Sequence, residues 1–318
     1  MNHPSKDFGM EFLHSIPIEK LPKFSVVIPS MNQAKFISQT LDSIYAQNYP
    51  NFEIFIADGG SSDETHQIVL PYQLSHPGQI TFSALKDGSH SAGVKRGIEA
   101  TNGEVIAWIN SDDVYTSGAF WHVARFFMFN TSQYIVFGDN DYVDEKLNFM
   151  YEYPIKHSVK MSEFRSNLVD FCQVPQPSLF FRRTLLQYVQ GPNSKIIDYE
   201  MWLRWSRDFQ FNYIPHKLSL SRLHGNSITM NAEKKLLNGI IKTVYSEFHV
   251  ISYSWVRKKH EVIARGNFSD KPISKSKIIL IAIWSRFEWI LLTLLTIPDQ
   301  LANSCKKKIV MILKYAKK

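Results

Sequence analysis

Two adjacent aspartates, Asp112 and Asp113, directly follow an apolar run at residues 105–109. If that run is a buried strand, both carboxylates stand at the carboxyl edge of a sheet, where open α/β folds bind their ligands. Carboxylate oxygens at such an edge suit Mg²⁺ or Mn²⁺, which keep bound water and can hold a diphosphate. The alternative is that the two acids only open a turn after the strand. The pair therefore predicts a metal site, provided that the surrounding elements form such a sheet.

Apolar runs alternate with segments of helical spacing over the first part of the chain. The expected strands are 24–28, 52–57, 80–85 and 105–109, and the expected helices are 36–47, 64–70 and 92–100. This alternation predicts βαβ units and an α/β fold, with a mostly parallel sheet flanked by helices. The loops that follow the four strands then gather along one edge of the sheet.

The composition indicates a globular protein with a basic tail. A chain of 318 residues with 44% apolar and 20% charged residues can bury an α/β core and carry a smaller appendage. Residues 255–318 contain 14 Lys or Arg against 4 Asp or Glu, a net charge of +10, which leaves −3 for the first 254 residues. A near-neutral body of this kind does not indicate a nucleic-acid-binding protein.

The cysteines and the N-terminal residues give indications of the cellular compartment in which the protein works. Cys172 and Cys305 lie far apart and match no metal-binding spacing, which excludes a disulfide framework and fits a reducing, cytoplasmic environment. The N-terminal residues lack a charged start followed by an apolar core, so a signal peptide is not expected.

Several motifs, spread in order over about residues 24–230, resemble those of family 2 glycosyltransferases of the GT-A fold. They are Ser25–Ser30, Leu41–Pro50, Glu53–Asp63, Gly103–Asp113, Gln176–Ser178 and Ile197–Arg204. One such motif would be a weak signal, but their succession in the family's order is specific. The resemblance implies an inverting transferase that binds a nucleotide diphosphate-sugar, with a UDP-sugar as the expected donor.

The resemblance assigns the donor site to loops that follow the first strands. Pro29 would shape the first loop so that backbone groups meet the base and ribose, and Asp58 would hold the uracil or ribose. Lys86 and Arg96 would be cations near the diphosphate or base. The alternatives are an ordinary glycine turn after Asp58 and a solvated helix face for Lys95 and Arg96.

The resemblance also assigns the metal. Asp112 would contact the ribose and Asp113 the divalent ion that bridges the diphosphate, while His224 would be a further ligand and Arg222 a phosphate clamp. The ion would neutralise the charge that the leaving group gains as the sugar bond breaks. A lone histidine such as His224 is more often only a polar side chain.

On the acceptor side, Asp198 matches the acid that acts as base in the family, with Glu200 as its competitor. Helical residues two apart do not share a face, so only one of the two can address the site. Asp198 could also cap its helix. Gln176 and Ser178 would flank the donor sugar and acceptor, unless they form a structural turn. Trp202 could stack on a sugar, although its helical spacing favours core packing.

The tail has an amphipathic character. Residues 278–297 are long enough to span a bilayer, but Arg286 and Glu288 interrupt their centre, each at a cost of roughly 2.5–3.5 kcal/mol on insertion scales. The polar residues of this stretch gather on one helical face, and residues 301–318 repeat the pattern with lysines. We therefore expect helices that lie in the surface of an anionic membrane. Spanning the membrane and packing on the catalytic domain are the alternatives.

The sequence thus predicts a lead-in at 1–22, a GT-A catalytic domain at 23–235, and a C-terminal helical, basic, membrane-associating region at 236–318. The catalytic domain would comprise a donor half at 23–115 and an acceptor half at 116–235. The expected function is transfer of a sugar to a glycan or lipid-linked acceptor in surface polysaccharide biosynthesis, lipopolysaccharide included, by a cytoplasmic protein held peripherally on the inner membrane surface.

Two other functions remain open. The first is a non-catalytic subunit that binds nucleotide-sugars or acts as a membrane scaffold in a glycan assembly complex. The second is a nucleotidyltransferase, which shares the metal chemistry of the sheet edge. A nucleotidyltransferase should carry a glycine-rich, basic loop after the first strand, and residues 29–34 form no such loop.

Overall fold

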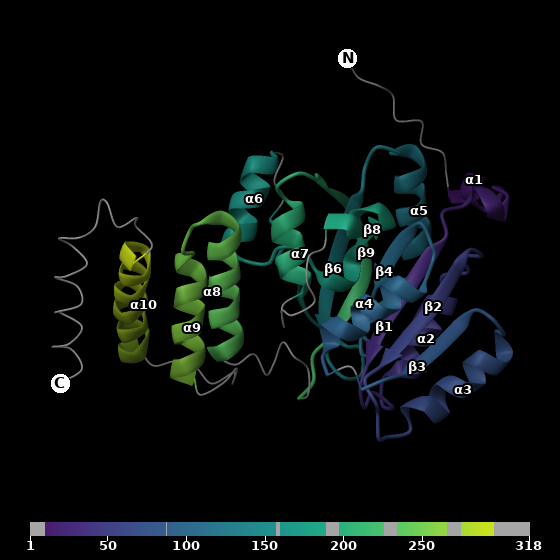
Figure 1. The fold of residues 1–318 in the computed structure, drawn as a ribbon, viewed down its shortest axis with the longest axis horizontal. Coiled ribbons are helices and arrows are strands. Elements are labelled where there is room, and N and C mark those ends of the chain that lie inside the picture. The colour runs from purple at the N-terminus through teal and green to yellow at the C-terminus, as the bar shows by residue number, and fades with distance from the viewer. Residues whose placement is uncertain are drawn as a thin grey trace, which may run out of the picture. The chain divides into compact units, whose positions relative to one another are not determined.

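The computed structural model of the chain describes residues 10–86, 88–156, 160–188, 197–225, 234–265 and 275–295. The chain separates into two compact units. The first comprises Met1–Met161 and Gln173–His224, and the second comprises Ser162–Cys172 and Gly225–Lys318 (Figure 1). The domain boundaries expected from the sequence at residues 22 and 235 stay predictions.

The first unit contains a nine-stranded sheet, counted over the described residues. Its strands are β1 (Phe24–Ser30), β2 (Phe52–Asp58), β3 (Ile80–Ala84), β4 (Val105–Trp108), β5 (Val114–Tyr115), β6 (Ile135–Val143), β7 (Phe149–Glu152), β8 (Leu179–Arg182) and β9 (Phe211–Arg222). Their order is β3-β2-β1-β4-β8-β6-β9-β5, with β7 paired to β6. Strands β1 to β4 pair in parallel, β8 is antiparallel to both neighbours, and β6 and β9 are parallel. This arrangement confirms the mostly parallel α/β fold.

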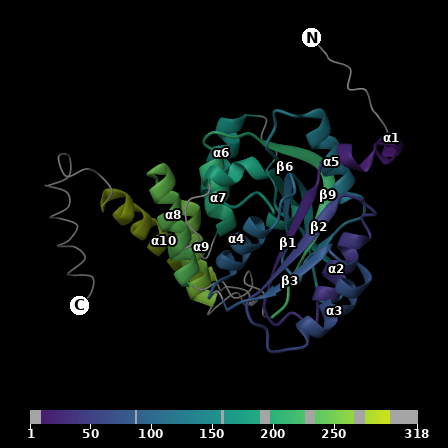
Figure 2. The same cartoon turned by 45° about the vertical axis from the view of Figure 1, so that its right-hand side comes forward.

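The helices of the first unit are α1 (Met10–His14), α2 (Ile37–Tyr45), α3 (Thr65–Ser75), α4 (His90–Ala100), α5 (Ala119–Phe129) and α7 (Ile197–Trp205), with short 3₁₀ segments η1 (Ile18–Lys20), η2 (Gln176–Ser178) and η3 (Arg183–Tyr188). Figure 2 shows α4 on the other side of the sheet from α2 and α3. Helix α4 approaches so closely that a Cβ at Gly97 would lie 2.5 Å from Cγ1 of Val27, so only glycine fits there.

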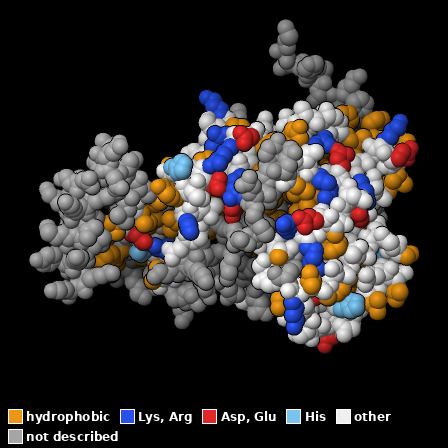
Figure 3. Space-filling model, in the orientation of Figure 1, with side chains coloured by type: hydrophobic (Ala, Val, Ile, Leu, Met, Phe, Trp, Pro, Cys, Tyr) orange, Lys and Arg blue, Asp and Glu red, His pale blue; other side chains and the backbone are white. Residues whose placement is uncertain are grey.

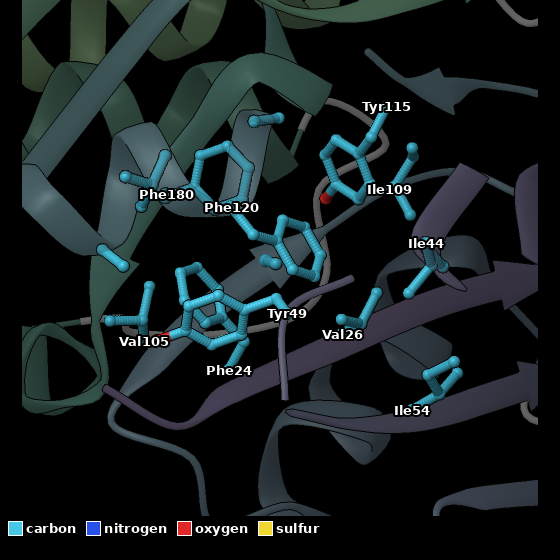
Figure 4. Close-up of a cluster of buried hydrophobic side chains, with 14 of the residues drawn as sticks. Phe24, Val26, Ile44, Tyr49, Ile54, Val105, Ile109, Tyr115, Phe120 and Phe180 are labelled. Atoms are coloured by element: carbon cyan, nitrogen blue, oxygen red, sulfur yellow. The ribbon is translucent and has the colours of Figure 1, made fainter. Parts of the chain in front are cut away.

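The core lies on the α2 side of the sheet, where alternate residues of the strands meet aromatic side chains (Figure 4). Strand β1 is buried along its whole length, which explains the apolar run Val26–Ile28 at its centre. The ring of Phe24 stacks on Phe120 at 4.8 Å and meets Tyr49 edge-on at 5.0 Å. These packed rings fix β1 and β4, the strands that lead into the loops of the carboxyl edge.

The opposite, amino edge of the same strands is held by a polar network. Oε1 of Glu53 accepts hydrogen bonds from Ser25 Oγ, Asn102 N and Gly103 N at 2.7–2.9 Å, and Oε2 accepts one from Lys23. The guanidinium of Arg183 donates to the carbonyls of Gly103 and Ile98, both at 2.7 Å. The network ties β1, β2, β4 and β8 together where their ends meet.

The second unit is helical. Its helices are α6 (Met161–Asp170), α8 (Lys234–Phe248), α9 (Tyr253–Arg265) and α10 (Lys275–Leu295), with α9 between α8 and α10 (Figure 1). The indole of Trp255 donates to the carbonyl of Val169 at 3.0 Å, which attaches α9 to α6. Among the described residues, we find no helix with the length and apolar character needed to cross a bilayer. The second amphipathic segment expected at 301–318 lies outside the described residues.

Two polar side chains of α10, Ser285 and Glu288, are turned toward α9, whereas Arg286 is exposed. Glu288 pairs with Lys259 and with His260, the latter at 2.6 Å, and Ser285 is fully buried. The sequence predicts Ser285, Arg286 and Glu288 on one face of the helix, but in the structure Arg286 lies apart from the two residues that face α9. Charged side chains are interspersed on the face of the first unit that Figure 3 shows, without one dominant basic patch.

Candidate active site

The two aspartates lie where β4, β5 and β9 meet at the carboxyl edge of the sheet. After β4 the chain turns tightly, with Asp113 N donating to Asn110 O at 3.1 Å, and then enters β5, which pairs with the end of β9. The backbone N–H of Arg222, the last residue of β9, donates to Asp113 Oδ1 at 2.9 Å. The hydroxyl of Thr40 in α2 binds the carbonyl of Asp113 at 2.7 Å. Asp113 is thus fixed from three sides and is buried.

The two carboxylates concentrate negative charge in this buried place. Burial raises the pKa of Asp113 well above its ordinary value, and the neighbouring Asp112 carboxylate raises it further, although hydrogen bonds from Arg222 and Asn110 oppose the rise. A bound cation would relieve both effects because it offsets the charge that burial and Asp112 disfavour. The electrostatics of the pair therefore fit a cation site.

His224 joins Asp112 at this edge. Its Nε2 lies 2.9 Å from Asp112 Oδ2, and its ring packs 4.7 Å from the ring of Phe36. In an octahedral ion with bonds of about 2.1 Å, neighbouring ligand atoms are about 3 Å apart, so this spacing suits two adjacent ligands. A carboxylate and an imidazole are acceptable ligands for Mn²⁺. The residues present fit a divalent ion whose remaining ligands would be diphosphate oxygens and water.

The protein ligands in this fit are two, Asp112 and His224. Among the described residues, no three side chains of His, Cys, Asp or Glu are placed to hold one ion. The carboxylate of Asp113 is turned toward Arg222 and toward Asn110, whose Nδ2 lies 3.4 Å from Oδ2. Asp113 as a direct ligand, as the family resemblance implies, therefore stays a prediction.

Arg222 is buried against the loop that carries the two aspartates, and its expected role as a phosphate clamp stays a prediction. It is 2% exposed, and its guanidinium donates to the carbonyls of Asp112 at 2.8 Å and Glu145 at 2.5 Å and to Gln39 Oε1 at 2.7 Å. It also stacks over the ring of Phe36 at 4.6 Å. These contacts make Arg222 an internal support for the loop that carries the two aspartates.

A chain of polar side chains continues from Asp113 along the edge. Asn110, which contacts Asp113, has two further partners. Its Nδ2 lies 3.3 Å from Gln176 Oε1, and its Oδ1 lies 3.0 Å from His90 Nε2. Gln176 in turn donates to the carbonyl of Trp108 at 2.6 Å. Neither Asn110 nor His90 is among the residues predicted from the sequence to be functional. The signal that could have found them is position: Asn110 lies in the loop after β4, and His90 begins α4 after the loop that follows β3.

Asp198 lies in the first turn of α7 and is partly buried. Burial raises the pKa of its carboxyl above the ordinary value, while the backbone N–H of Tyr199 and the charge of His90 oppose that rise. A partly buried carboxylate with a raised pKa is suited to accept a proton near neutral pH.

The other residues expected around the acceptor are engaged in the fold. Glu200 pairs with Arg204 at 2.6 Å, one turn along the same helix. Trp202 is 1% exposed and packs 5.3 Å from Trp205, so its ring is in the core and not available to a sugar. The hydroxyl of Ser178 is buried and donates to the carbonyl of Asp139 at 2.8 Å.

The expected donor residues lie around the ends of β1, β2 and β3. Pro29 is buried within β1, beside Ala57 of β2. Asp58 is also buried, and its carboxylate accepts the backbone N–H groups of Gly60 and Ser61 at 2.9 and 2.8 Å and the Ser61 hydroxyl. Gly60 has a φ of +93°, a backbone conformation that residues with a side chain rarely adopt. In this structure, Asp58 therefore organises its own turn.

The two expected cations differ in their surroundings. Arg96 donates from Nη1 to the carbonyl of Ser83 at 2.7 Å and from Nη2 to the carbonyl of Asp58 at 3.2 Å, which ties β3 to the end of β2. Lys86 is exposed, and its side chain passes over Gly60, where a Cβ would lie 2.7 Å from the lysine Cγ. Lys86 is thus the cation at the surface of this edge, whereas Arg96 supports the strands.

The fold and this edge define an α/β enzyme of the GT-A type, and comparison with known proteins agrees. The model of the family "Glycosyl transferase family 2" matches residues 25–187. The chain therefore belongs to this family and is a glycosyltransferase. An uncharacterised glycosyltransferase of Rickettsia prowazekii is 26% identical over 228 residues, which cover 68% of each chain. Chondroitin synthase of Escherichia coli is 24% identical over 227 residues, 69% of this chain but 32% of that one.

Solved structures share the fold. S. aureus TarS 1-349 in complex with UDP-GlcNAc aligns with a TM-score of 0.57 and 15% identity, over 87% of this chain and 82% of that one. The mannosyltransferase PcManGT from Pyrobaculum calidifontis, in complex with GDP-Man and Mn²⁺, aligns with a TM-score of 0.53 and 13% identity, over 90% and 89% of the two chains. At these identities the likeness establishes the shared fold.

Proposed function

We propose that this glycosyltransferase moves a sugar, with inversion at the anomeric carbon, from a nucleotide diphosphate-sugar to a hydroxyl of a glycan or lipid-linked acceptor. The observation that carries the proposal is the meeting of Asp112, Asp113 and His224 at the carboxyl edge of the sheet. The donor would place its diphosphate at the aspartates, and its sugar would extend toward Asp198. UDP is the first candidate nucleotide, and GDP the second, because structural neighbours hold UDP-GlcNAc and GDP-Man.

The proposed reaction needs a base and a stabilised leaving group. The acceptor oxygen attacks the anomeric carbon, its proton passes to the Asp198 carboxylate, and the bond from that carbon to the diphosphate oxygen breaks with its electron pair on the nucleoside diphosphate. Asp112 and His224, with Asp113 beside them, would hold a Mg²⁺ or Mn²⁺ ion, which supplies charge neutralisation for the departing diphosphate. Arg222 and Asn110 keep the two acids in place during this step.

The burial of Asp198 supports its assignment as the base. A carboxylate with its usual low pKa would be a weak proton acceptor, and a raised pKa brings it nearer to the pH at which the enzyme works. Glu200 is the competing candidate, but its carboxylate is held by Arg204. We therefore assign proton transfer to Asp198 and a structural ion pair to Glu200.

The test is the release of nucleoside diphosphate from UDP-GlcNAc or GDP-Man in the presence of lipid-linked or soluble glycan acceptors. Asp198→Asn should lower kcat by at least about 100-fold, the usual contribution of a general base. Glu200→Gln is the matched control and should keep most of the activity. Equal losses in both variants, or no loss in Asp198→Asn, would contradict the assignment. Full activity of every site variant in cells would instead favour a non-catalytic subunit.

The proposed place of work is the cytoplasmic face of a membrane, with the protein attached peripherally. The support is the charge distribution, since residues 255–318 carry a net charge of +10 while the remainder carries −3. A positively charged region is attracted to anionic headgroups, at about 1 kcal/mol for each Lys or Arg near the surface. A lipid-linked acceptor would be available at that surface.

A further inference from the structure

Helix α10 is oriented opposite to an ordinary surface helix of a globular protein. A helix packed on its neighbours normally turns its apolar face inward and its polar face to water. In α10 two polar side chains are inward, because Glu288 pairs with Lys259 and His260 of α9 and Ser285 is fully buried. The indole of Trp289 also donates to the carbonyl of Ile251 at 2.7 Å. These contacts fix the rotation of α10 about its axis.

The side of α10 that faces away from α9 consequently carries many apolar side chains, with the exposed Arg286 among them. We call it the outer face of α10, and it consists of Ile279, Leu280, Ile283, Trp284, Phe287 and Ile290. Ile279, Ile283, Phe287 and Ile290 are spaced by three or four residues and form one line along the helix. Ile279 is 61% exposed, Ile283 57% and Trp284 53%. A contiguous exposed apolar surface of this kind marks a place where something else binds.

The charge of this part of the chain selects the binding partner. The region that carries the outer face has a net charge of +10, and exposed Arg286 lies on α10 itself, one residue from Phe287 along the chain. A second copy of the chain would bring an equal positive charge against the first, which is unfavourable. An anionic lipid surface offers apolar contact and negative charge together. Arg286 can extend its guanidinium to the headgroups while its carbon chain stays with the apolar side chains.

We propose that the outer face of α10 lies in the interfacial layer of an anionic membrane, with the helix parallel to the membrane plane. Glu288 stays paired with α9 in this arrangement, so no charge has to enter the lipid. The inference deepens the proposed function, since it names the surface through which the enzyme reaches a lipid-linked acceptor. It does not depend on the identity of the donor or on the assignment of the base.

The test measures binding of the full-length protein to vesicles of phosphatidylcholine alone and of phosphatidylcholine with phosphatidylglycerol. Wild-type protein should sediment with the anionic vesicles, and less with the neutral ones. Ile283→Glu combined with Phe287→Glu should lower the partition coefficient at least about tenfold, because two apolar anchors are lost and two like charges face the lipid. Leu74→Glu is the matched control, because Leu74 is an apolar residue of α3, 74% exposed, and its substitution should leave binding unchanged.

A second measurement locates the contact on α10. Brominated lipids quench tryptophans that enter the interfacial layer, and the chain has 7 tryptophans. The quenching seen for wild-type protein should fall in Trp284→Phe, which keeps an apolar ring at that position. Equal quenching in the two proteins would place the contact elsewhere and overturn the proposal.

Other outcomes separate this inference from its competitors. Vesicle binding that the double substitution does not change would overturn it. A wild-type dimer that the double substitution dissociates, without vesicle binding, would show that a second copy covers the outer face. The outcome is also separable from the transferase proposal. Nucleotide-dependent thermal stabilisation should be retained in the double variant, and vesicle binding should be retained in Asp198→Asn.

Discussion

Arg222 provides a sharp test because the family resemblance and the structure assign it different roles. A phosphate clamp would contribute only when the donor is bound, whereas an internal support contributes to the stability of the empty protein. The perturbations are Arg222→Met, which removes the charge and all its donors, and Arg222→Lys, which keeps the charge but not the planar fork.

The expected magnitude follows from the contacts of the guanidinium. Arg222→Met would leave the carbonyls of Asp112 and Glu145 and the amide oxygen of Gln39 without their donors, and would remove the contact with Phe36. Removing a buried charge from its partners in this way typically costs about 3–5 kcal/mol. Arg222→Lys can restore one of the three hydrogen bonds and should cost about 1–3 kcal/mol.

The assay is urea unfolding of both variants without nucleotide and without metal, with Lys95→Met as the control. Lys95 is an exposed cation of the same unit, paired with Glu99 at 3.6 Å, and its loss should change stability by less than about 1 kcal/mol. If Arg222→Met unfolds like the control and only nucleotide binding is weakened, the supporting role is wrong and the clamp is right.

Three further predictions concern other parts of the first unit. Burial alone would raise the pKa of Glu53, but the hydrogen bonds to its carboxylate outweigh burial and lower this pKa below the ordinary 4.5. The ionised Glu53 should therefore stabilise the fold above about pH 4.5, and this contribution should be lost in more acidic solution. In urea unfolding at pH 7, Glu53→Ala should therefore cost about 2–4 kcal/mol, with the difference from wild type shrinking as the pH falls below 4.5. His90→Gln should move the acidic limb of the pH profile of kcat/KM to higher pH, because the positive charge of His90, which lowers the pKa of Asp198, is lost. An unchanged limb would show that a group other than Asp198 titrates there. Gly97→Ala should destabilise by about 1–3 kcal/mol, whereas Gly239→Ala, with no atom within 4 Å of the added Cβ, should stabilise slightly.

The sequence was sufficient for the family, the enzyme class and the layout of the first sheet strands. The reason is physical: the central residues of β1, β2 and β4 are buried on both faces, so each strand contains a short apolar run, and each strand ends at a polar loop. The carboxyl ends of parallel strands share one edge, and this places Asp112 near the other loops without knowledge of any distant contact.

Contacts made across long sequence separations could not be derived in this way. Arginine is a residue type that often binds phosphate. Only the pairing of β9 with β5 and β6 shows that Arg222 points into the loop of the aspartates. Asn110 and His90 are 20 residues apart and meet only through the fold. In α10, helical periodicity places Ser285 and Glu288 near one another, but the inward direction of Glu288 depends on Lys259 and His260 of another helix.

The central claim is that the paired aspartates hold the donor through a divalent ion, while Asp198 acts only on the acceptor. The direct measurement is the shift in melting temperature caused by a nucleoside diphosphate with Mn²⁺ in wild-type protein, Asp112→Asn and Asp198→Asn. At about 100 times Kd, binding stabilises by about 2.7 kcal/mol, which corresponds to a shift of about 5–10 °C. We predict this shift in wild type and in Asp198→Asn and its absence in Asp112→Asn; a full shift in Asp112→Asn, or none in Asp198→Asn, would contradict the claim.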